Sequence, residues 1–277
     1  MQTETFVHPS AVVEPGAQLG AGAHIGPFCH VGPEVVIGAG TRLISHVTVL
    51  GATTIGENCT VHSQAVLVGL PQNMSHKGGR TTLTIGNNCT IREFVTMNTG
   101  TDNSRGATIV GDNCNFLAYC HVAHDCVIGN NVTFANGATL AGHCEIGDNV
   151  GIGGLSAVHQ FVRVGRNAFL AGGSMIAGDV IPFGIAVGNR AKLRGLNMVG
   201  LRRSGMSKAE IKTLLSAYRT VFDRSRPVSE NIEIARAEFA ESPTAMLIVD
   251  FISDRGKRHY TVPPVKGAVD DDADDQD

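Results

Sequence analysis

The chain has 277 residues, of which 43% are hydrophobic and 17% charged, and it carries a formal net charge of −3. This composition is typical of a soluble globular protein and, at that length, of roughly two domains. No apolar run approaches the ~18 to 20 residues that span a bilayer, which excludes stable membrane insertion. The first ten residues lack the basic and apolar regions of a secretory signal. We therefore expect a cytoplasmic protein whose seven cysteines are reduced thiols.

An apolar residue recurs at every sixth position through most of the chain. The series runs over residues 7–67, returns over 85–97, and resumes one residue out of step over 110–176. An α-helix needs a period of 3.6 and a half-buried strand a period of two, so neither explains it. A period of six fits a coil of three short strands joined by tight turns in which Gly or Asn adopts the strained conformations. The sequence therefore predicts a mainly β protein, a left-handed parallel β-helix of about nine coils.

The cysteines follow the same register. Each lies four residues after a phased apolar residue, where the neighbouring coil leaves room only for a small side chain: Cys29, Cys59, Cys89, Cys114, Cys120, Cys126 and Cys144. The short Cys-x-x-Cys spacings of zinc sites are absent. We therefore predict that the cysteines are small buried hydrophobic residues and not metal ligands.

Two polar, glycine-rich segments interrupt the hexads, at residues 70–79 and 99–108. Long insertions on a rigid scaffold cost little, so each segment could be filler. Loops on rigid scaffolds also carry binding and catalytic residues. Position alone leaves both interpretations open.

The hexads stop beyond Ile181, and helical signals follow. Ser207 and Glu210 have the spacing of a capping box before an amphipathic stretch. A second helical stretch near 229–253 is interrupted at Ser242-Pro243. We predict a β-helix over 1–190, a small C-terminal helical domain over 191–262, and a disordered acidic tail over 263–277.

Positive charge is concentrated in residues 160–226, which contain twelve Lys or Arg and only three acidic residues. Such a block could be a solvated face, a nucleic-acid patch or a docking surface for an acidic protein. Nucleic acid is disfavoured, because the block has few aromatic residues for base stacking and no known binding motif. A docking surface for an acidic carrier protein suits a small prism better than a nucleic-acid patch does.

Histidines gather in the second half of the repeat: His121, His124, His143 and His159. One coil is three hexads, so His124 and His143 lie on adjacent coils, point away from the axis and become neighbours beside Asp125. These residues could bind zinc, as in some β-helix hydratases, or provide a general base for acyl transfer. The chain has no Gly-x-Ser-x-Gly elbow and no phased cysteine nucleophile, which favours direct transfer without a covalent enzyme intermediate.

Four motifs are specific enough to indicate a protein family: HVAHDCVIGNN at 121–131, ATLAGHCEIGD at 138–148, AVHQFVRVG at 157–165 and GLNMVGLRRSG at 195–205. Together they resemble the UDP-N-acetylglucosamine acyltransferases of lipid A synthesis, and the likeness extends over nearly the whole chain. The resemblance implies a homotrimer with active sites between adjacent prisms and no cofactor or metal. It also implies 3-hydroxyacyl-acyl carrier protein as the donor and the 3-hydroxyl of UDP-N-acetylglucosamine as the acceptor, in the first step of lipid A biosynthesis.

Residue by residue, the same resemblance implies that His124 is the general base, that Asp125 orients it, and that the Gly142 N–H binds the oxyanion. The implied substrate contacts are Gln72, Asn73, His121, His143, His159, Gln160, Gly172, Asn197 and Arg203. Within this set, Asn197 and Arg203 act from the next subunit. Gly172 takes the position that measures acyl length, where glycine favours a longer chain.

The sequence also departs from the pattern of many relatives. Asn73 and Ser75 stand where many have Asp and Lys, and Asn98 and Arg190 where some have His. Some relatives acylate a 3-amino sugar, so oxygen or nitrogen at the acceptor position stays open. Three further functions compete with this one: N-acylation of a later precursor by an enzyme of the same fold, zinc-dependent hydration on a β-helix, and a non-catalytic scaffold.

Overall fold

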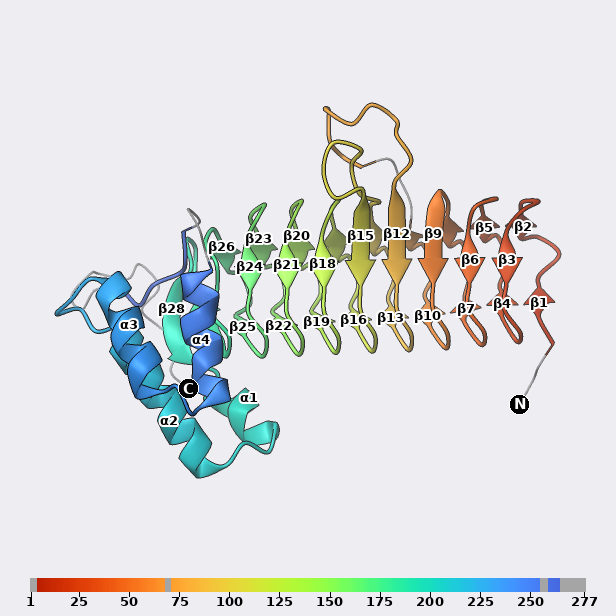
Figure 1. The fold of residues 1–277 in the computed structure, drawn as a ribbon. Coiled ribbons are helices and arrows are strands. Elements are labelled where there is room, and N and C mark those ends of the chain that lie inside the picture. Colours follow the sequence, from red (N-terminus) through yellow and green to blue (C-terminus); the bar gives the residue numbers. More distant parts are fainter. Residues whose placement is uncertain (1–3, 68–70, 255–258, 265–277) are drawn as a thin grey trace.

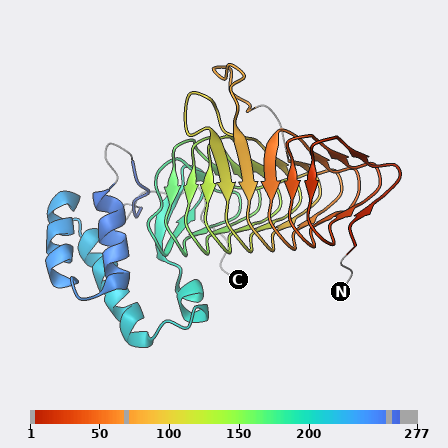
Figure 2. The same cartoon turned by 45° about the vertical axis from the view of Figure 1, so that its right-hand side comes forward.

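The computed structural model describes residues 4–67, 71–254 and 259–264. The chain winds into a three-sided parallel β-helix, and four helices pack at its C-terminal end (Figure 1). The view turned by 45° shows the triangular coils stacked along one axis (Figure 2). Three sheets form the sides, and the nine strands of one of them match the predicted number of coils. The β-helix and the C-terminal helices predicted from the sequence are confirmed.

Short strands, most of them two residues long, make up the three sheets. The first sheet contains, in order, β1 (Phe6–Val7), β4 (His24–Ile25), β7 (Arg42–Leu43), β10 (Thr60–Val61), β13 (Thr90–Ile91), β16 (Asn115–Phe116), β19 (Thr133–Phe134), β22 (Gly151–Ile152), β25 (Phe169–Leu170), β27 (Gly184–Val187) and β28 (Lys192–Leu196). The second contains β2 (Val12–Val13), β5 (His30–Val31), β8 (Thr48–Val49), β11 (Val66–Leu67), β14 (Thr96–Met97), β17 (His121–Val122), β20 (Thr139–Leu140), β23 (Ala157–Val158) and β26 (Met175–Ile176). The third contains β3 (Gln18–Leu19), β6 (Val36–Ile37), β9 (Ala52–Ile55), β12 (Thr82–Ile85), β15 (Ala107–Val110), β18 (Val127–Ile128), β21 (Glu145–Ile146) and β24 (Arg163–Val164).

The hexads form a single apolar core along the axis. The phased residues from Ile25 to Ile176 are buried, and all seven cysteines are buried and free, as predicted. At the edge between the third and first sheets, asparagines adopt φ between 54 and 59°: Asn58, Asn88, Asn113, Asn131, Asn149 and Asn167. Asparagine tolerates this left-handed conformation, which turns the chain sharply between strands.

Both interruptions of the hexads occur at one edge of the prism, between the second and third sheets. The first, residues 71–81, precedes β12 and is named the acceptor loop because the resemblance assigns its Gln72 and Asn73 to substrate contacts. The second, residues 98–106, joins β14 to β15 and is named the coupling loop because it hydrogen-bonds both the first loop and Asp125. Because β11, β14 and β17 are neighbours in the second sheet, the two loops belong to consecutive coils just before the turn from β17 to β18. Figures 1 and 2 show them projecting together from that edge.

The C-terminal helices are α1 (Met198–Arg203), α2 (Lys208–Val221), α3 (Val228–Glu238) and α4 (Pro243–Ser253). Ser207 and Glu210 form the predicted capping box of α2. The second helical stretch is divided into α3 and α4, with Pro243 in the first turn of α4, where its missing N–H is harmless. Within the described residues, no helix is long and apolar enough to cross a membrane. Most of the predicted acidic tail, residues 265–277, lies outside the described residues.

Arg163 joins the prism to the helices. Its Nε donates to Asp179 Oδ2 at 2.8 Å, its Nη2 donates to the Phe251 carbonyl of α4 at 3.0 Å, and its guanidinium lies 4.5 Å from the Phe251 ring centre. The Arg163 and Asp179 side chains are only 10% and 2% exposed, so this pair is shielded from water.

We expect Arg163→Ala to lower the free energy of unfolding by about 3–5 kcal/mol, because it leaves Asp179 buried without its main cation. Arg166→Ala is the matched control. The Arg166 guanidinium is 46% exposed and 4.0 Å from Asp148, so its loss should change stability by less than about 1 kcal/mol. Urea unfolding followed by circular dichroism measures both, and equal losses would contradict this interpretation.

Candidate active site

His124 lies at the turn between β17 and β18, on the coil that follows the two loops. Its side chain points away from the prism axis, as the hexad register predicts. It is nevertheless buried, with 8% of its surface exposed. The acceptor loop contributes to this burial, with Asn73 Nδ2 3.5 Å from His124 Nε2, together with Gly142 and the His143 ring on the next coil. The hexads predict the direction of the side chain but not the loop that covers it.

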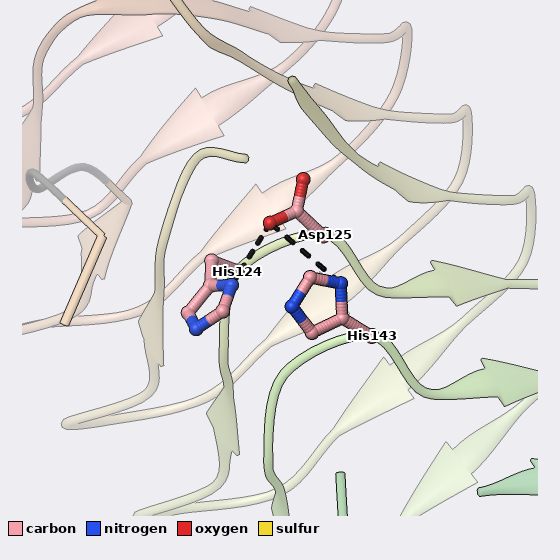
Figure 3. Close-up of side chains that lie close together, drawn as sticks. All are labelled: His124, Asp125 and His143. Carbon is pink, nitrogen blue, oxygen red and sulfur yellow. Dashed lines mark hydrogen bonds and ion pairs between the residues drawn. The ribbon is translucent and has the colours of Figure 1, made fainter. Parts of the chain in front are cut away.

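His124 and Asp125 form a hydrogen-bonded pair (Figure 3). His124 Nδ1 lies 2.9 Å from Asp125 Oδ2. A carboxylate only accepts hydrogen bonds, so Nδ1 carries the proton of the neutral ring and Nε2 keeps its lone pair. Nε2 is the nitrogen on the side of the acceptor loop. The pair therefore presents a basic nitrogen to whatever binds beside that loop.

Asp125 is itself held by the coupling loop. Its carboxylate accepts hydrogen bonds from the Thr101 hydroxyl at 2.7 Å, the Thr101 N–H at 3.1 Å and the Gly106 N–H at 3.0 Å. Burial acts to raise the pKa of Asp125, but the hydrogen bonds from Thr101 and His124 outweigh it, so the pKa lies below its usual value. Asp125 is consequently an anion at neutral pH, as a partner for an imidazolium must be.

His143 is the neighbour of His124 on the next coil, as the 18-residue repeat predicts. The two rings meet edge to face with centres 4.9 Å apart, and Figure 3 shows both side chains directed at the Asp125 carboxylate. His143 Nδ1 lies 4.0 Å from Asp125 Oδ2 and 3.2 Å from Ser104 Oγ, and its ring stacks on Phe161. Burial lowers the pKa of His143, which keeps the ring neutral near pH 7.

Gly142 packs directly against the face of His124. A Cβ at this position would lie 2.6 Å from His124 Cε1 and 2.8 Å from Nε2, so only glycine leaves the ring in place. Among the residues that the structure describes, no acceptor takes the Gly142 backbone N–H. A free N–H beside the basic nitrogen is the arrangement that an oxyanion requires.

A pocket of about 540 Å³ opens in front of this pair, on the face of the second sheet. Its walls include the predicted residues Gln72, His121, His124, Gly142, His159 and Gln160. His121 is bound through Nδ1 to the Thr96 hydroxyl at 2.7 Å, and burial, followed by the nearby His124, lowers its pKa. His159 and Gln160 are exposed at the rim. The rest of the lining is mostly apolar and includes Met175 and Ile176.

Six predicted residues do not line this pocket. Asn73, Asp125 and His143 contact His124 without belonging to the lining, and the other three are Gly172, Asn197 and Arg203. Gly172 is exposed, and a Cβ there would meet only the Gly154 backbone, at 3.4 Å or more. Asn197 is the N-cap of α1, where its side chain accepts from the Gly200 N–H, and Arg203 is exposed in the last turn of the same helix. Figure 1 places α1 below the C-terminal coils, near β25, whereas β18 lies nearer the middle of the prism.

Thr101, Ser104 and Met175 also contact the site and were not predicted from the sequence. Thr101 and Ser104 belong to the segment whose position alone did not distinguish filler from function. Their polar side chains in a glycine-rich break were the available signal. Met175 is the outward-facing residue of a late hexad, and its 42% exposure in the lining of a mostly apolar pocket suits contact with a hydrocarbon chain.

His124, Asp125 and His143 offer three potential metal-ligand atoms within 4.8 Å of one another. Three protein ligands are the usual number in catalytic zinc sites. Here, however, the Asp125 carboxylate already accepts hydrogen bonds from Thr101, Gly106 and His124. These contacts orient His124 as a base, which favours proton transfer over coordination as the use of this cluster.

The fold and the site together define a hexapeptide-repeat acyltransferase. The profile of the bacterial transferase hexapeptide matches residues 107–142, which include His124, Asp125 and Gly142. A second profile, described as UDP-N-acetylglucosamine O-acyltransferase domain 2, matches residues 179–260.

Two relatives and one solved structure extend the likeness to the full chain. The chain is 68% identical over 277 residues to an acyl-[acyl-carrier-protein]--UDP-N-acetylglucosamine O-acyltransferase of Mesorhizobium japonicum, covering 100% of this chain and 99% of the relative. The protein of the same name from Bartonella henselae is 52% identical over 263 residues, or 95% of this chain and 96% of the relative. The structure of the UDP-N-acetylglucosamine acyltransferase from Campylobacter jejuni superposes with a TM-score of 0.87 at 41% identity, covering 94% and 100% of the two chains. The chain belongs to the UDP-N-acetylglucosamine O-acyltransferase family, and the left-handed β-helix predicted from the hexads is confirmed.

Proposed function

We propose that the chain transfers a 3-hydroxyacyl group from acyl carrier protein to the 3-hydroxyl of UDP-N-acetylglucosamine, the first step of lipid A biosynthesis. The observation that carries this proposal is the His124–Asp125 pair, with His124 Nε2 directed at a pocket beside the acceptor loop. The names of the relatives give the same reaction class, donor and acceptor.

The pair supports direct transfer. Neutral His124 Nε2 takes the proton of the acceptor hydroxyl as the oxygen attacks the thioester carbonyl carbon. A C–O bond forms, the C–S bond breaks, and the imidazolium returns the proton to the departing thiolate. Asp125, kept ionised by Thr101, stabilises the imidazolium while it exists. One bond is exchanged for another and one proton moves from the hydroxyl to the thiolate, so the step involves no oxidation or reduction.

The Gly142 N–H is the donor for the oxyanion that forms on the thioester carbonyl. Gly142 packs against the His124 ring, so we expect one substrate to reach the base and this donor together. A single such donor contributes on the order of 3–4 kcal/mol to stabilising the transition state. The apolar lining that includes Met175 and Ile176 provides surface for the acyl chain, with Gly172 leaving its region open.

Acceptor binding falls to the polar rim. Gln72 and Asn73 approach from the acceptor loop, His159 and Gln160 lie at the exposed rim of the pocket, and His143 lies beside His124 and Asp125. Asn197 and Arg203, remote from the pocket within one chain, are proposed to reach the site of an adjacent subunit in a homotrimer. The site would then be complete only in the assembly.

The carrier protein is proposed to dock on the exposed basic side chains of α1 and α2 and of the strand before them. Arg190, Lys192, Arg202, Lys208 and Lys212 are exposed there. Arg163, counted in the same block, is buried against Asp179 and belongs to the structural contact between prism and helices. Exposed charge of one sign favours encounter with an acidic carrier, and salt should weaken that encounter.

Mass spectrometry of reaction products tests this function. The purified chain is incubated with UDP-N-acetylglucosamine, or its 3-amino analogue, and a panel of 3-hydroxyacyl carrier proteins of increasing length. We expect a single acyl adduct on the 3-oxygen of UDP-N-acetylglucosamine, formed fastest with one of the longer chains. Product only with the amino sugar would identify the second acceptor as the true one, and no product with any donor would refute the proposal.

A further inference from the structure

Asp102, in the coupling loop, fastens that loop to the acceptor loop. Its Oδ2 accepts the backbone N–H groups of Gly79 at 2.9 Å and Lys77 at 3.1 Å, and its Oδ1 lies 3.2 Å from His76 Nδ1. The N–H of Gly79, followed by that of Lys77, holds the pKa of Asp102 below its usual value. The carboxylate is therefore charged at neutral pH, and charged acceptors form the stronger hydrogen bonds.

The two loops also approach as closely as their backbones allow. A Cβ added to Gly79 would lie 2.5 Å from the Asp102 Cβ, a separation that real Cβ atoms do not tolerate. A second bridge runs nearby, from Asn103 Nδ2 to Ser75 Oγ at 3.0 Å. Ser75 in turn donates to Asn73 Oδ1 through its hydroxyl at 2.6 Å and its N–H at 2.9 Å. Hydrogen bonds therefore link the coupling loop, through Ser75, to Asn73, which approaches His124.

The coupling loop also contacts the catalytic pair. Thr101, the residue before Asp102, binds the Asp125 carboxylate through both its hydroxyl and its N–H. One short stretch therefore holds Asp125 with one residue and the acceptor loop with the next. The relative position of the Asn73 amide and the His124–Asp125 pair depends on this stretch.

We propose that Asp102 is a positioning residue, which couples the two loops so that the acceptor loop is held in register with the His124–Asp125 pair and the sugar binds between them. This inference rests on the proposed function. Asp102 touches neither His124 nor Asp125 in the contacts above, so its effect is exerted through the backbone of the acceptor loop. Binding of the acceptor, and not of the acyl carrier, should depend on it.

Steady-state kinetics of Asp102→Ala tests the inference in the full chain. We expect the KM for UDP-N-acetylglucosamine to rise about tenfold, because three polar contacts of a charged group are lost. The kcat at saturating acceptor and the KM for the acyl carrier should each change by less than about threefold, since binding is lost equally from ground and transition states. Asp102→Asn keeps an oxygen acceptor for Gly79 N–H and should recover most of the acceptor affinity.

Asp112→Ala is the matched control. Asp112 Oδ1 accepts the backbone N–H of Asn87 at 2.6 Å on the same prism, away from both loops. Its removal should leave the acceptor KM unchanged, even if it lowers the melting temperature as much as Asp102→Ala does. Equal acceptor KM values in the two variants would overturn the inference.

Gly79→Ala disturbs the same contact from the other side. Its Cβ would force the acceptor loop away from Asp102, so the acceptor KM should rise as in Asp102→Ala. A normal acceptor KM in this variant would also contradict the coupling. If the unsubstituted chain forms no product, the proposed function itself has failed. If the unsubstituted chain is active but Asp102→Ala and Gly79→Ala have a normal acceptor KM, the proposed function stands and only the role of Asp102 is refuted.

Discussion

Replacing His124 with alanine is expected to lower kcat by on the order of 10²–10⁴-fold, the usual contribution of a positioned general base. The reason is geometric. His124 Nε2 is the lone-pair nitrogen beside the acceptor loop, and His143 Nδ1 instead lies against Ser104 and Asp125. His143 therefore keeps that nitrogen away from the acceptor loop, and His121 Nδ1 is engaged by the Thr96 hydroxyl. Initial rates of acyl transfer, measured at saturating concentrations of both substrates, give the change in kcat directly.

The control for this variant is His62→Ala. His62 is a half-buried histidine of the same prism, paired with Glu93 at 3.4 Å and far from the turn between β17 and β18. Its loss should leave kcat within about twofold of the starting value, as for a surface substitution remote from the site. Both variants should keep the circular dichroism of the β-helix. A nearly normal kcat for His124→Ala would remove His124 as the base.

Replacing Gly142 with alanine should lower kcat by about 10²-fold or more. The new Cβ would lie 2.6–3.1 Å from three atoms of the His124 ring, so the ring must move. A displacement of about 1 Å at a reacting group is enough for a loss of that size. The same movement would separate His124 from Asp125 and from the oxyanion donor. The prism itself should be preserved, because the strain falls on one outward-facing side chain.

Gly32→Ala is the comparison for this variant. Gly32 follows β5 on the same side of the prism, and a Cβ there would meet first the end of the flexible Leu50 side chain, at 3.0 Å. Activity should therefore survive in Gly32→Ala. The tautomer of His124, followed by nuclear magnetic resonance of its ring nitrogens, should change only in Gly142→Ala. An active Gly142→Ala with an undisturbed His124 signal would contradict the close packing.

The hexads predicted the fold because a period of six can be satisfied by few backbones. The contact of His124 with His143 followed from the same arithmetic, since residues one coil apart in a β-helix are stacked by backbone hydrogen bonds. Each Asn at a corner and each Cys beside the axis had a local reason that the sequence displays. For these residues, position in the repeat determines position in space.

The loops could not be predicted in this way. Their conformations depend on contacts such as Asp102 with Gly79 and Thr101 with Asp125, which join residues with no periodic relation. The approach of Asn73 to His124, which adds to the burial of that ring, has no periodic signal either. Asn197 and Arg203 came from the family resemblance alone, and within one chain they lie away from the pocket. The roles proposed for them concern the assembly.

Direct transfer by His124 is tested most directly in a single turnover. Enzyme, 3-hydroxyacyl carrier protein and UDP-N-acetylglucosamine are mixed at equal concentration, quenched at successive times, and the intact masses of enzyme, carrier and nucleotide sugar are followed together. We expect the acyl mass to pass from carrier to sugar while the mass of the enzyme stays constant throughout. An enzyme species heavier by the acyl group, formed and consumed at the rate of product formation, would show covalent catalysis and contradict the role assigned to His124.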